Sequence, residues 1–153
     1  MPVGILSATS VTAQADKVEG DSTVRVVIVD DQAPFREAAR AVVERAKEFE
    51  LVGEADSGEE AVDVIDALRP DLVLMDINMG GISGIEATNR ITAAHPEVTV
   101  FLLSTYNEDD LPPDVRTCGA AAYMNKENFG GRLMRTTWEA GGQDGWRKRL
   151  LPA

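Results

Sequence analysis

The chain has 153 residues, of which 44% are hydrophobic, and a formal net charge of −11 at pH 7. This size and apolar content suit one ordinary domain with a single core that needs no disulfide or structural metal. The acidic balance disfavours an electrostatic, sequence-independent role in nucleic-acid binding. The one basic run, at 147–149, is too short to change that expectation.

Cysteine content and hydropathy exclude further classes. The single cysteine, Cys118, cannot form an internal disulfide, and no Cys/His zinc pattern is present, so we expect a reducing, cytoplasmic compartment. No apolar run approaches the roughly 20 residues that span a bilayer, so we expect no membrane partner. Residues 1–23 lack the features of a signal peptide and are interpreted as a flexible, polar N-terminal tail.

From residue 24, short β-branched runs alternate with segments of helical spacing. This alternation is typical of a parallel sheet covered by helices. The predicted strands are 24–29, 51–55, 71–75, 98–103 and 121–125. The first, third and fourth are nearly all apolar, so we expect them to be central and covered on both faces.

The first three predicted helices have clear signals. Apolar residues recur at helical spacing over 35–49, which indicates one face packed on the sheet. Ser57 and Glu60 form a capping-box pair that starts the second helix, and Ser83 and Glu86 repeat this pattern for the third.

The last two predicted helices are less regular. Pro112 and Pro113 fit a first turn but not a helix interior, so the fourth helix should be short and start late. The fifth is predicted from about Asn128 to Ala140, and residues 141–153 are interpreted as a C-terminal linker or tail.

Polar side chains stand at the carboxyl ends of the predicted strands. They are Asp30 and Asp31 after the first, Asp76 at the third, Ser104 at the fourth and Lys126 at the fifth. Each alone would suit a cap, a turn or a solvated loop. Ligands of a doubly wound parallel sheet bind outside the carboxyl ends of its strands, so the joint placement indicates a site.

The residue types at this edge point to phosphoryl chemistry. Three clustered carboxylates repel one another and raise one another's pKa unless a cation holds them. An oxygen-only donor set suits Mg²⁺, which keeps positions open for phosphoryl oxygens. Lys126 adds positive charge and Ser104 adds a hydroxyl, so the group fits a transferring phosphoryl group.

Four stretches resemble the receiver domain of bacterial two-component response regulators. They are VVIVDDQAPFREA, DLVLMDINMGGISGIEATNRI, VFLLST and GAAAYMNKE. The resemblance covers residues 24–140 and is closest to the branch that usually carries a C-terminal helix-turn-helix domain. It implies a flavodoxin-like α/β fold, a doubly wound five-stranded parallel sheet in the order 2-1-3-4-5 with helices on both faces.

The resemblance also implies a phosphoacceptor and a metal site. Asp76 is then the phosphoacceptor, and Mg²⁺ is held by Asp30, Asp31, Asp76 and the backbone carbonyl of Asn78.

The remaining implied roles concern the switch. Ser104 is the switch hydroxyl, Lys126 contacts the phosphoryl group, and Tyr123 is the switch aromatic. The family usually has proline where Gly80 stands, so the loop after Asp76 has more freedom to lose on ordering.

The function implied is a signalling switch phosphorylated on Asp76 by a histidine kinase or a phosphotransfer protein. It is not an enzyme of metabolism, but a phosphoprotein with self-catalysed phosphotransfer and autodephosphorylation. The chain leaves no room for a helix-turn-helix, so we expect no direct nucleic-acid binding. Output is expected through a downstream protein partner or self-association, at the surface of the fourth helix, fifth strand and fifth helix.

Two alternatives stay open. The chain can be the N-terminal fragment of a DNA-binding transcriptional regulator. It can also be a Mg²⁺-dependent phosphatase that forms an aspartyl phosphate. Such enzymes commonly carry a second Asp two residues after the nucleophile, and Asn78 at that position argues against this reading.

Overall fold

The computed structural model describes residues 23–142. Its five strands are β2 (Val24–Val29), β3 (Phe49–Ala55), β4 (Leu72–Asp76), β5 (Thr99–Ser104) and β6 (Ala122–Asn125). The predicted tail at 1–23 and linker at 141–153 fall almost wholly outside the described residues. Within the described part, no helix combines the length and the apolar character that crossing a membrane requires.

The strands form one parallel sheet in the order β3-β2-β4-β5-β6. Counted along the chain, this is the predicted order 2-1-3-4-5. Every residue of β4 is buried, as are all but the first of β5. The prediction that the most apolar strands are central is therefore confirmed, because only a strand covered on both faces can bury an uninterrupted apolar run.

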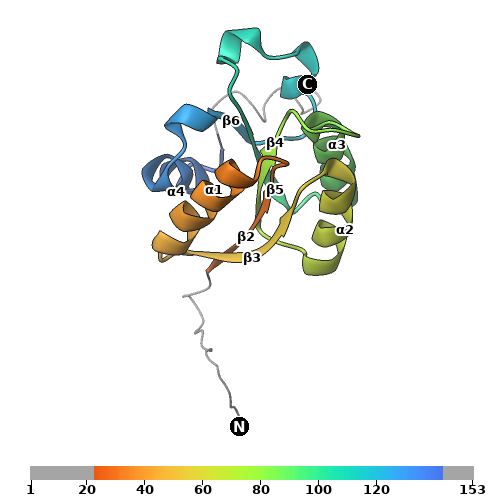
Figure 1. The fold of residues 1–153 in the computed structure, drawn as a ribbon. Coiled ribbons are helices and arrows are strands. Elements are labelled where there is room, and N and C mark those ends of the chain that lie inside the picture. The colour runs from red at the N-terminus through yellow and green to blue at the C-terminus, as the bar shows by residue number, and fades with distance from the viewer. Residues whose placement is uncertain (1–22, 143–153) are drawn as a thin grey trace.

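Four α-helices cover the sheet within the described residues: α1 (Ala33–Arg45), α2 (Gly58–Leu68), α3 (Gly84–Ala94) and α4 (Gly131–Glu139). Helices α1 and α4 lie on one face, and α2 and α3 lie on the other (Figure 1). Successive strand residues point to opposite faces, so Leu74 joins the core under α1 and α4, and Met75 joins the core under α2 and α3.

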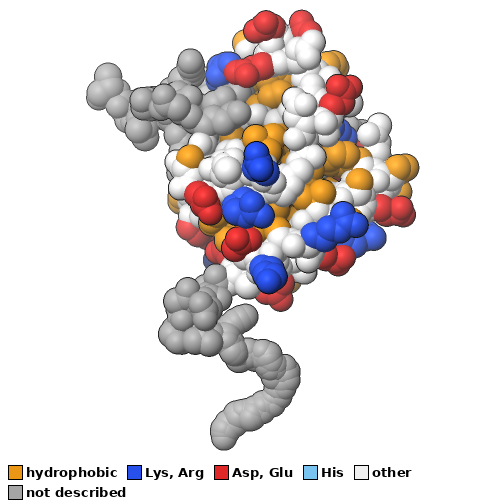
Figure 2. Space-filling model, turned by 90° about the vertical axis from the view of Figure 1, so that its left-hand side faces the viewer, with side chains coloured by type: hydrophobic (Ala, Val, Ile, Leu, Met, Phe, Trp, Pro, Cys, Tyr) orange, Lys and Arg blue, Asp and Glu red, His pale blue; other side chains and the backbone are white. Residues whose placement is uncertain are grey.

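The outer surface of α1 and α4 carries charges of both signs, including exposed Glu37, Glu44 and Arg45 on α1. Figure 2 shows Lys and Arg side chains on this face next to exposed apolar ones. Arg45 and Arg135 line a hollow of about 240 Å³ between the two helices. Asp30, Asp31 and Asp76 lie elsewhere, at the carboxyl ends of the strands.

Both predicted N-caps are present. The Ser57 hydroxyl accepts from the backbone N–H of Glu60 at 3.0 Å, and the Ser83 hydroxyl accepts from that of Glu86 at 3.2 Å. The reciprocal half of the capping box differs from the prediction. The Glu60 carboxylate accepts from the backbone N–H of Asp56, and the Glu86 carboxylate pairs with the arginine four residues further along α3.

The first helix is shorter than predicted. It ends at Arg45, and Ala46 is already extended with φ −91° and ψ 111°. Phe49, predicted to lie on the helix face, instead begins β3 two residues before the predicted start. Its ring packs into the core of α1 and β2 from the strand, so an apolar residue suits either position.

The prediction of a fourth α-helix is wrong. Between β5 and β6 the chain forms two 3-10 turns, η1 (Glu108–Asp110) and η2 (Pro113–Arg116). Leu111 and Pro112 between them are extended. A proline disfavours helical backbone in the residue before it, so the two consecutive prolines keep the turns separate. Gly119, with φ +100°, then ends the segment before β6.

The last helix starts later than predicted. Residues Lys126–Asn128 form a 3-10 turn, η3, and Gly130 is fully extended as the N-cap of α4. The helix therefore begins at Gly131, three residues after the predicted start. Gly130 therefore marks the helix boundary, and Gly131 is the first residue of the helix.

Candidate functional site

Three carboxylates meet at the carboxyl ends of β2 and β4. The two strands are hydrogen-bonded neighbours, with Val29 opposite Met75, so Asp30 and Asp76 follow side by side. One oxygen from each of Asp30, Asp31 and Asp76 lies within 4.8 Å of the others. Asp30 and Asp76 are buried, with 1% and 3% of their surface exposed, whereas Asp31 is exposed.

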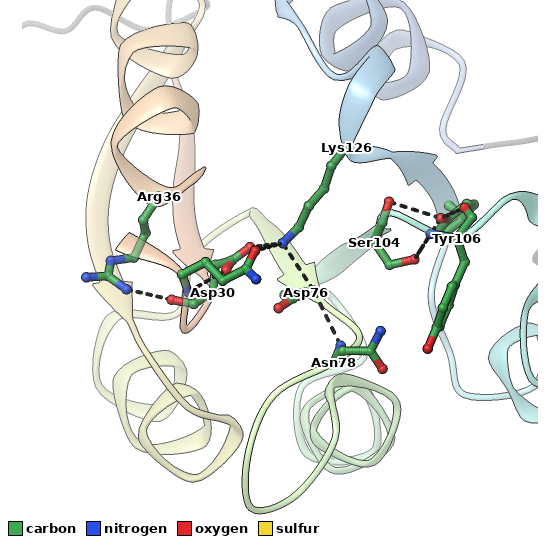
Figure 3. Close-up of polar contacts among 9 residues, drawn as sticks. Asp30, Arg36, Asp76, Asn78, Ser104, Tyr106 and Lys126 are labelled. Carbon is green, nitrogen blue, oxygen red and sulfur yellow. Dashed lines mark hydrogen bonds and ion pairs between the residues drawn. The ribbon is translucent and has the colours of Figure 1, made fainter. Parts of the chain in front are cut away.

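Lys126 crosses from the end of β6 to these acids (Figure 3). Its Nζ lies 2.7 Å from Asp30 Oδ2 and 3.4 Å from Asp76 Oδ1. The Gln32 side-chain carbonyl accepts from Nζ at 3.3 Å, and the Phe35 ring lies beneath it at 4.6 Å. One ammonium faces three carboxylates, so the cluster keeps excess negative charge when all are ionised.

The surroundings of Asp76 raise the pKa of its carboxyl group. Burial, and then the charge of Asp30, raise the pKa of Asp76 to about 6, although Lys126 and the Asn78 N–H oppose the rise. The Asn78 N–H donates to Asp76 Oδ1 at 3.3 Å. An oxygen-only cluster of two buried carboxylates and one exposed carboxylate, with uncompensated charge, fits a hard divalent cation such as Mg²⁺.

Three hydrogen bonds, two to its backbone and one to its carboxylate, hold Asp30 in place. Its N–H donates to the Ala55 carbonyl at the end of β3 at 3.1 Å. Its Oδ1 accepts from the Gln32 N–H at 2.8 Å, and its carbonyl accepts from Arg36 Nη1 at 2.6 Å. The sequence pattern did not single out Arg36, because its role depends on a side chain that turns back toward the strand end.

Gly84 lets the start of α3 pack against the end of β4. A Cβ at this position would lie 1.9 Å from the Asp76 carbonyl oxygen. The Gly84 N–H donates to the Ile77 carbonyl at 2.9 Å and closes the intervening loop. Sequence analysis missed this residue. The signal available was a glycine at the first helical position, directly after the Ser83 cap.

The loop after Asp76 is held by α2. Glu59 in the first turn of α2 accepts from the Ile82 N–H at 3.1 Å. Gly81 has φ +75°, and a Cβ there would lie 2.7 Å from the Glu59 carboxylate oxygens. Gly80, which stands where the family usually has proline, has open space around it. A contact from another helix therefore restrains this loop.

Ser104 and Tyr123 form a second polar group beside the acids. The Ser104 hydroxyl accepts from the Tyr106 N–H at 3.0 Å and lies 2.8 Å from the Tyr123 hydroxyl. The Tyr123 hydroxyl also contacts the Tyr106 carbonyl. Tyr123 is buried, and this burial raises its pKa. The structure thus unites Asp30, Asp31, Asp76 and Lys126, and turns Ser104 toward the tyrosines.

A doubly wound sheet in this strand order, with an acidic cluster at its carboxyl edge, is the architecture of a flavodoxin-like domain. The model of the response regulator receiver domain matches residues 26–137, and the chain belongs to that family. The predicted family and fold class are confirmed. A receiver domain is a signalling switch rather than a metabolic enzyme.

Relatives support this assignment. The chain is 36% identical over 107 residues to the transcriptional regulatory protein DegU of Brevibacillus brevis, covering 70% of this chain and 45% of DegU. It is 39% identical over 103 residues to the response regulator GacA of Pseudomonas viridiflava, covering 67% and 48%. The chain therefore spans about half the length of the curated relatives it matches.

A solved receiver-domain structure has the same fold. The signal receiver domain of the response regulator NarL from Mycobacterium tuberculosis superposes with a TM-score of 0.72 at 28% identity. The match covers 78% of this chain and 97% of that one.

Proposed function

We propose that Asp76 accepts a phosphoryl group from a histidine kinase or a phosphotransfer protein, and that the chain acts as a phosphorylation-dependent switch. The observation that carries the proposal is the position of Asp76. It is buried against Asp30, with Lys126 Nζ 3.4 Å from its Oδ1. The receiver domain proper is proposed to be residues 24–140, with a tail before it and a linker after it.

In the proposed reaction, an Asp76 carboxylate oxygen attacks the phosphorus of a phosphohistidine. An O–P bond forms, the N–P bond breaks, and the imidazole leaves with a proton from solvent. Lys126 stabilises the negative charge of the phosphoryl oxygens. Asp30, Asp31, Asp76 and the Asn78 carbonyl would hold Mg²⁺, which when bound neutralises charge on the transferring group.

The phosphorylated state is proposed to decay by hydrolysis of the acyl phosphate. The residue two positions after Asp76 is Asn78, whose amide cannot serve as an acid or base in this hydrolysis. The chemistry therefore favours a switch with a lasting phosphorylated state over a phosphatase that turns over rapidly.

Output is proposed to pass through a downstream protein or self-association. The sequence predicts that this surface is formed by a fourth helix together with β6 and α4. In the structure, η1 and η2 take the place of that helix. A second candidate is that the chain is the receiver portion of a DNA-binding transcriptional regulator. The observation that favours it is the half-length match to DegU, which is named a transcriptional regulatory protein.

The proposal is tested by intact-mass measurement after incubation with acetyl phosphate, with Mg²⁺ and with EDTA. Wild type should gain the mass of one phosphoryl group only with Mg²⁺, and Asp76→Asn should gain none. Asp63→Asn, which changes an exposed carboxylate on α2, serves as the matched control and should behave as wild type. Equal phosphorylation of Asp76→Asn and wild type would refute the assignment.

A further inference from the structure

Arg36 connects the acidic edge of the sheet to β3. It lies in the first turns of α1, and its guanidinium reaches back to the strand end (Figure 3). Nη1 donates to the Asp30 carbonyl at 2.6 Å, and Nε lies 3.3 Å from Glu54 Oε1 on β3. The Arg36 side chain is 22% exposed, so these contacts are largely shielded from water.

The Asp30 carbonyl controls the direction of Asp31. The C=O of Asp30 and the N–H of Asp31 belong to one planar peptide unit. A hydrogen bond that fixes this carbonyl therefore also fixes the orientation of the peptide plane that leads into Asp31. The Asp30 carboxylate has its own partners in Gln32 and Lys126, but Asp31 is exposed and depends on the backbone for its position.

On its other side, Arg36 shares the Glu54 carboxylate with Arg40. Arg40 binds Glu54 with two hydrogen bonds, Nε to Oε2 at 2.8 Å and Nη2 to Oε1 at 3.0 Å. Hydrogen bonding from Arg40 is the main cause that lowers the pKa of Glu54, so this carboxylate is charged at neutral pH. Glu54 therefore pairs with both arginines, but only Arg36 donates to the Asp30 carbonyl.

We propose that Arg36 is a positioning residue for the divalent-cation site, because it fixes the Asp30–Asp31 peptide and thereby the Asp31 carboxylate. This inference rests on the proposed Mg²⁺ site. Two effects of Arg36 have opposite signs. As a nearby positive charge it would repel Mg²⁺, so its removal would tighten binding. As a positioning group it pre-organises a ligand, so its removal would weaken binding.

We expect positioning to prevail, because the guanidinium charge is already paired with Glu54. Removing a group that orients a metal ligand typically costs on the order of tenfold in affinity. The direction of the change in Mg²⁺ affinity therefore decides between the two effects.

The test is Mg²⁺ titration by calorimetry of wild type, Arg36→Met, Arg36→Lys and Arg40→Met. Arg36→Met should weaken Mg²⁺ binding about tenfold. Arg40→Met is the matched control, since it also loses ion pairing with Glu54 but leaves the Arg36–Asp30 bond, and it should bind close to wild type. Arg36→Lys should be intermediate, because one ammonium cannot bind the carbonyl and Glu54 as a planar fork does.

Thermal unfolding of the same variants separates positioning from stability. Both methionine variants remove ion pairing between α1 and β3, so both should lose some stability, yet only Arg36→Met should lose Mg²⁺ affinity. Equal or tighter Mg²⁺ binding by Arg36→Met would overturn the positioning role. Absence of Mg²⁺ binding by wild type would overturn the metal site itself, so the two failures are distinguishable.

Discussion

Asp76 is buried beside a second carboxylate, and its pKa of about 6 has a consequence for stability. An unfolded aspartate titrates near a pKa of about 4, so the folded protein holds this proton more tightly. This contribution to stability is complete at low pH and is lost as the pH rises from about 4 to about 6. At neutral pH, ionised Asp76 therefore destabilises the metal-free protein.

Asp76→Asn should consequently be more stable than wild type at pH 7 without metal, by on the order of 1–3 kcal/mol. The difference should shrink as the pH falls through about 6 toward 4, because Asp76 becomes protonated in the folded state before it does in the unfolded state. Urea unfolding in EDTA at pH 4.5 and pH 7 measures this difference. An Asp76→Asn protein that gains nothing at pH 7 would show that burial and Asp30 do not strain the carboxylate.

The four charged residues of the cluster could be predicted from the sequence, but their supports could not. Asp30, Asp31, Asp76 and Lys126 follow apolar strands, and the ends of neighbouring parallel strands meet at one edge. Arg36 lies one helical turn into α1, and the sequence does not indicate that its side chain turns back toward the end of β2. Residue type fixes the chemistry at a strand end, whereas long-range contacts fix its orientation.

At the scale of elements, the first turn of α2 holds the loop between β4 and α3 by a hydrogen bond. Glu59 accepts from the Ile82 N–H at 3.1 Å, and the adjacent Gly80 provides no restraint. Glu59→Ala should speed amide hydrogen exchange in this loop, above all at Ile82. Glu59→Gln should stay near wild type, because its side-chain carbonyl can still accept the bond.

Glu60→Ala is the control for this prediction, since Glu60 lies in the same helical turn but accepts from the Asp56 N–H. It should speed exchange at the start of α2 and leave the loop unchanged. Equal exchange at Ile82 in Glu59→Ala and wild type would show that the loop is held by other contacts.

The segment between β5 and β6 shows where local pattern is insufficient. The two prolines are incompatible with a helix interior, and the sequence pattern predicts a short helix that starts with them. The chain instead forms η1 and η2, because each proline also extends the residue before it. The periodicity of apolar residues predicts the type of each strand and of helices α1 to α3. The ends of the elements, and the conformation of this segment, depend instead on the backbone geometry of proline and glycine.

This segment is expected to respond to phosphorylation. Its two short turns contain few backbone hydrogen bonds, which is typical of regions with low local stability. The Ser104 hydroxyl is hydrogen-bonded to Tyr106 and Tyr123 in this structure, so we expect these bonds to change when it contacts a phosphoryl group. Tyr123 is already buried in this structure.

We therefore predict that beryllofluoride with Mg²⁺ increases amide protection across residues 104–126 in wild type, because Ser104 draws the segment toward the acids. Ser104→Ala should bind the mimic but show little change in protection. Hydrogen exchange read by mass spectrometry measures both. The same protection with and without the mimic in wild type would exclude this surface as the output.

At the scale of the whole molecule, the topology follows from the alternation of strands and helices. Right-handed crossovers between parallel strands place helices on both faces of the sheet. The reversal of winding at β2 and β4 puts Asp30 beside Asp76, and β6 on the far side brings Lys126 back to them. Acids from two strands and a lysine from a third thus form one site only in the folded chain.

The central claim is that Asp76, among the three clustered carboxylates, carries the phosphoryl group. Borohydride reduces an acyl phosphate to an alcohol, which marks the modified residue permanently. Peptide mass mapping of wild type, treated with acetyl phosphate and Mg²⁺ and then reduced, should place the mark at Asp76 and leave Asp30 and Asp31 unmodified. A mark at Asp30 or Asp31, or one divided among the three residues, would contradict the account.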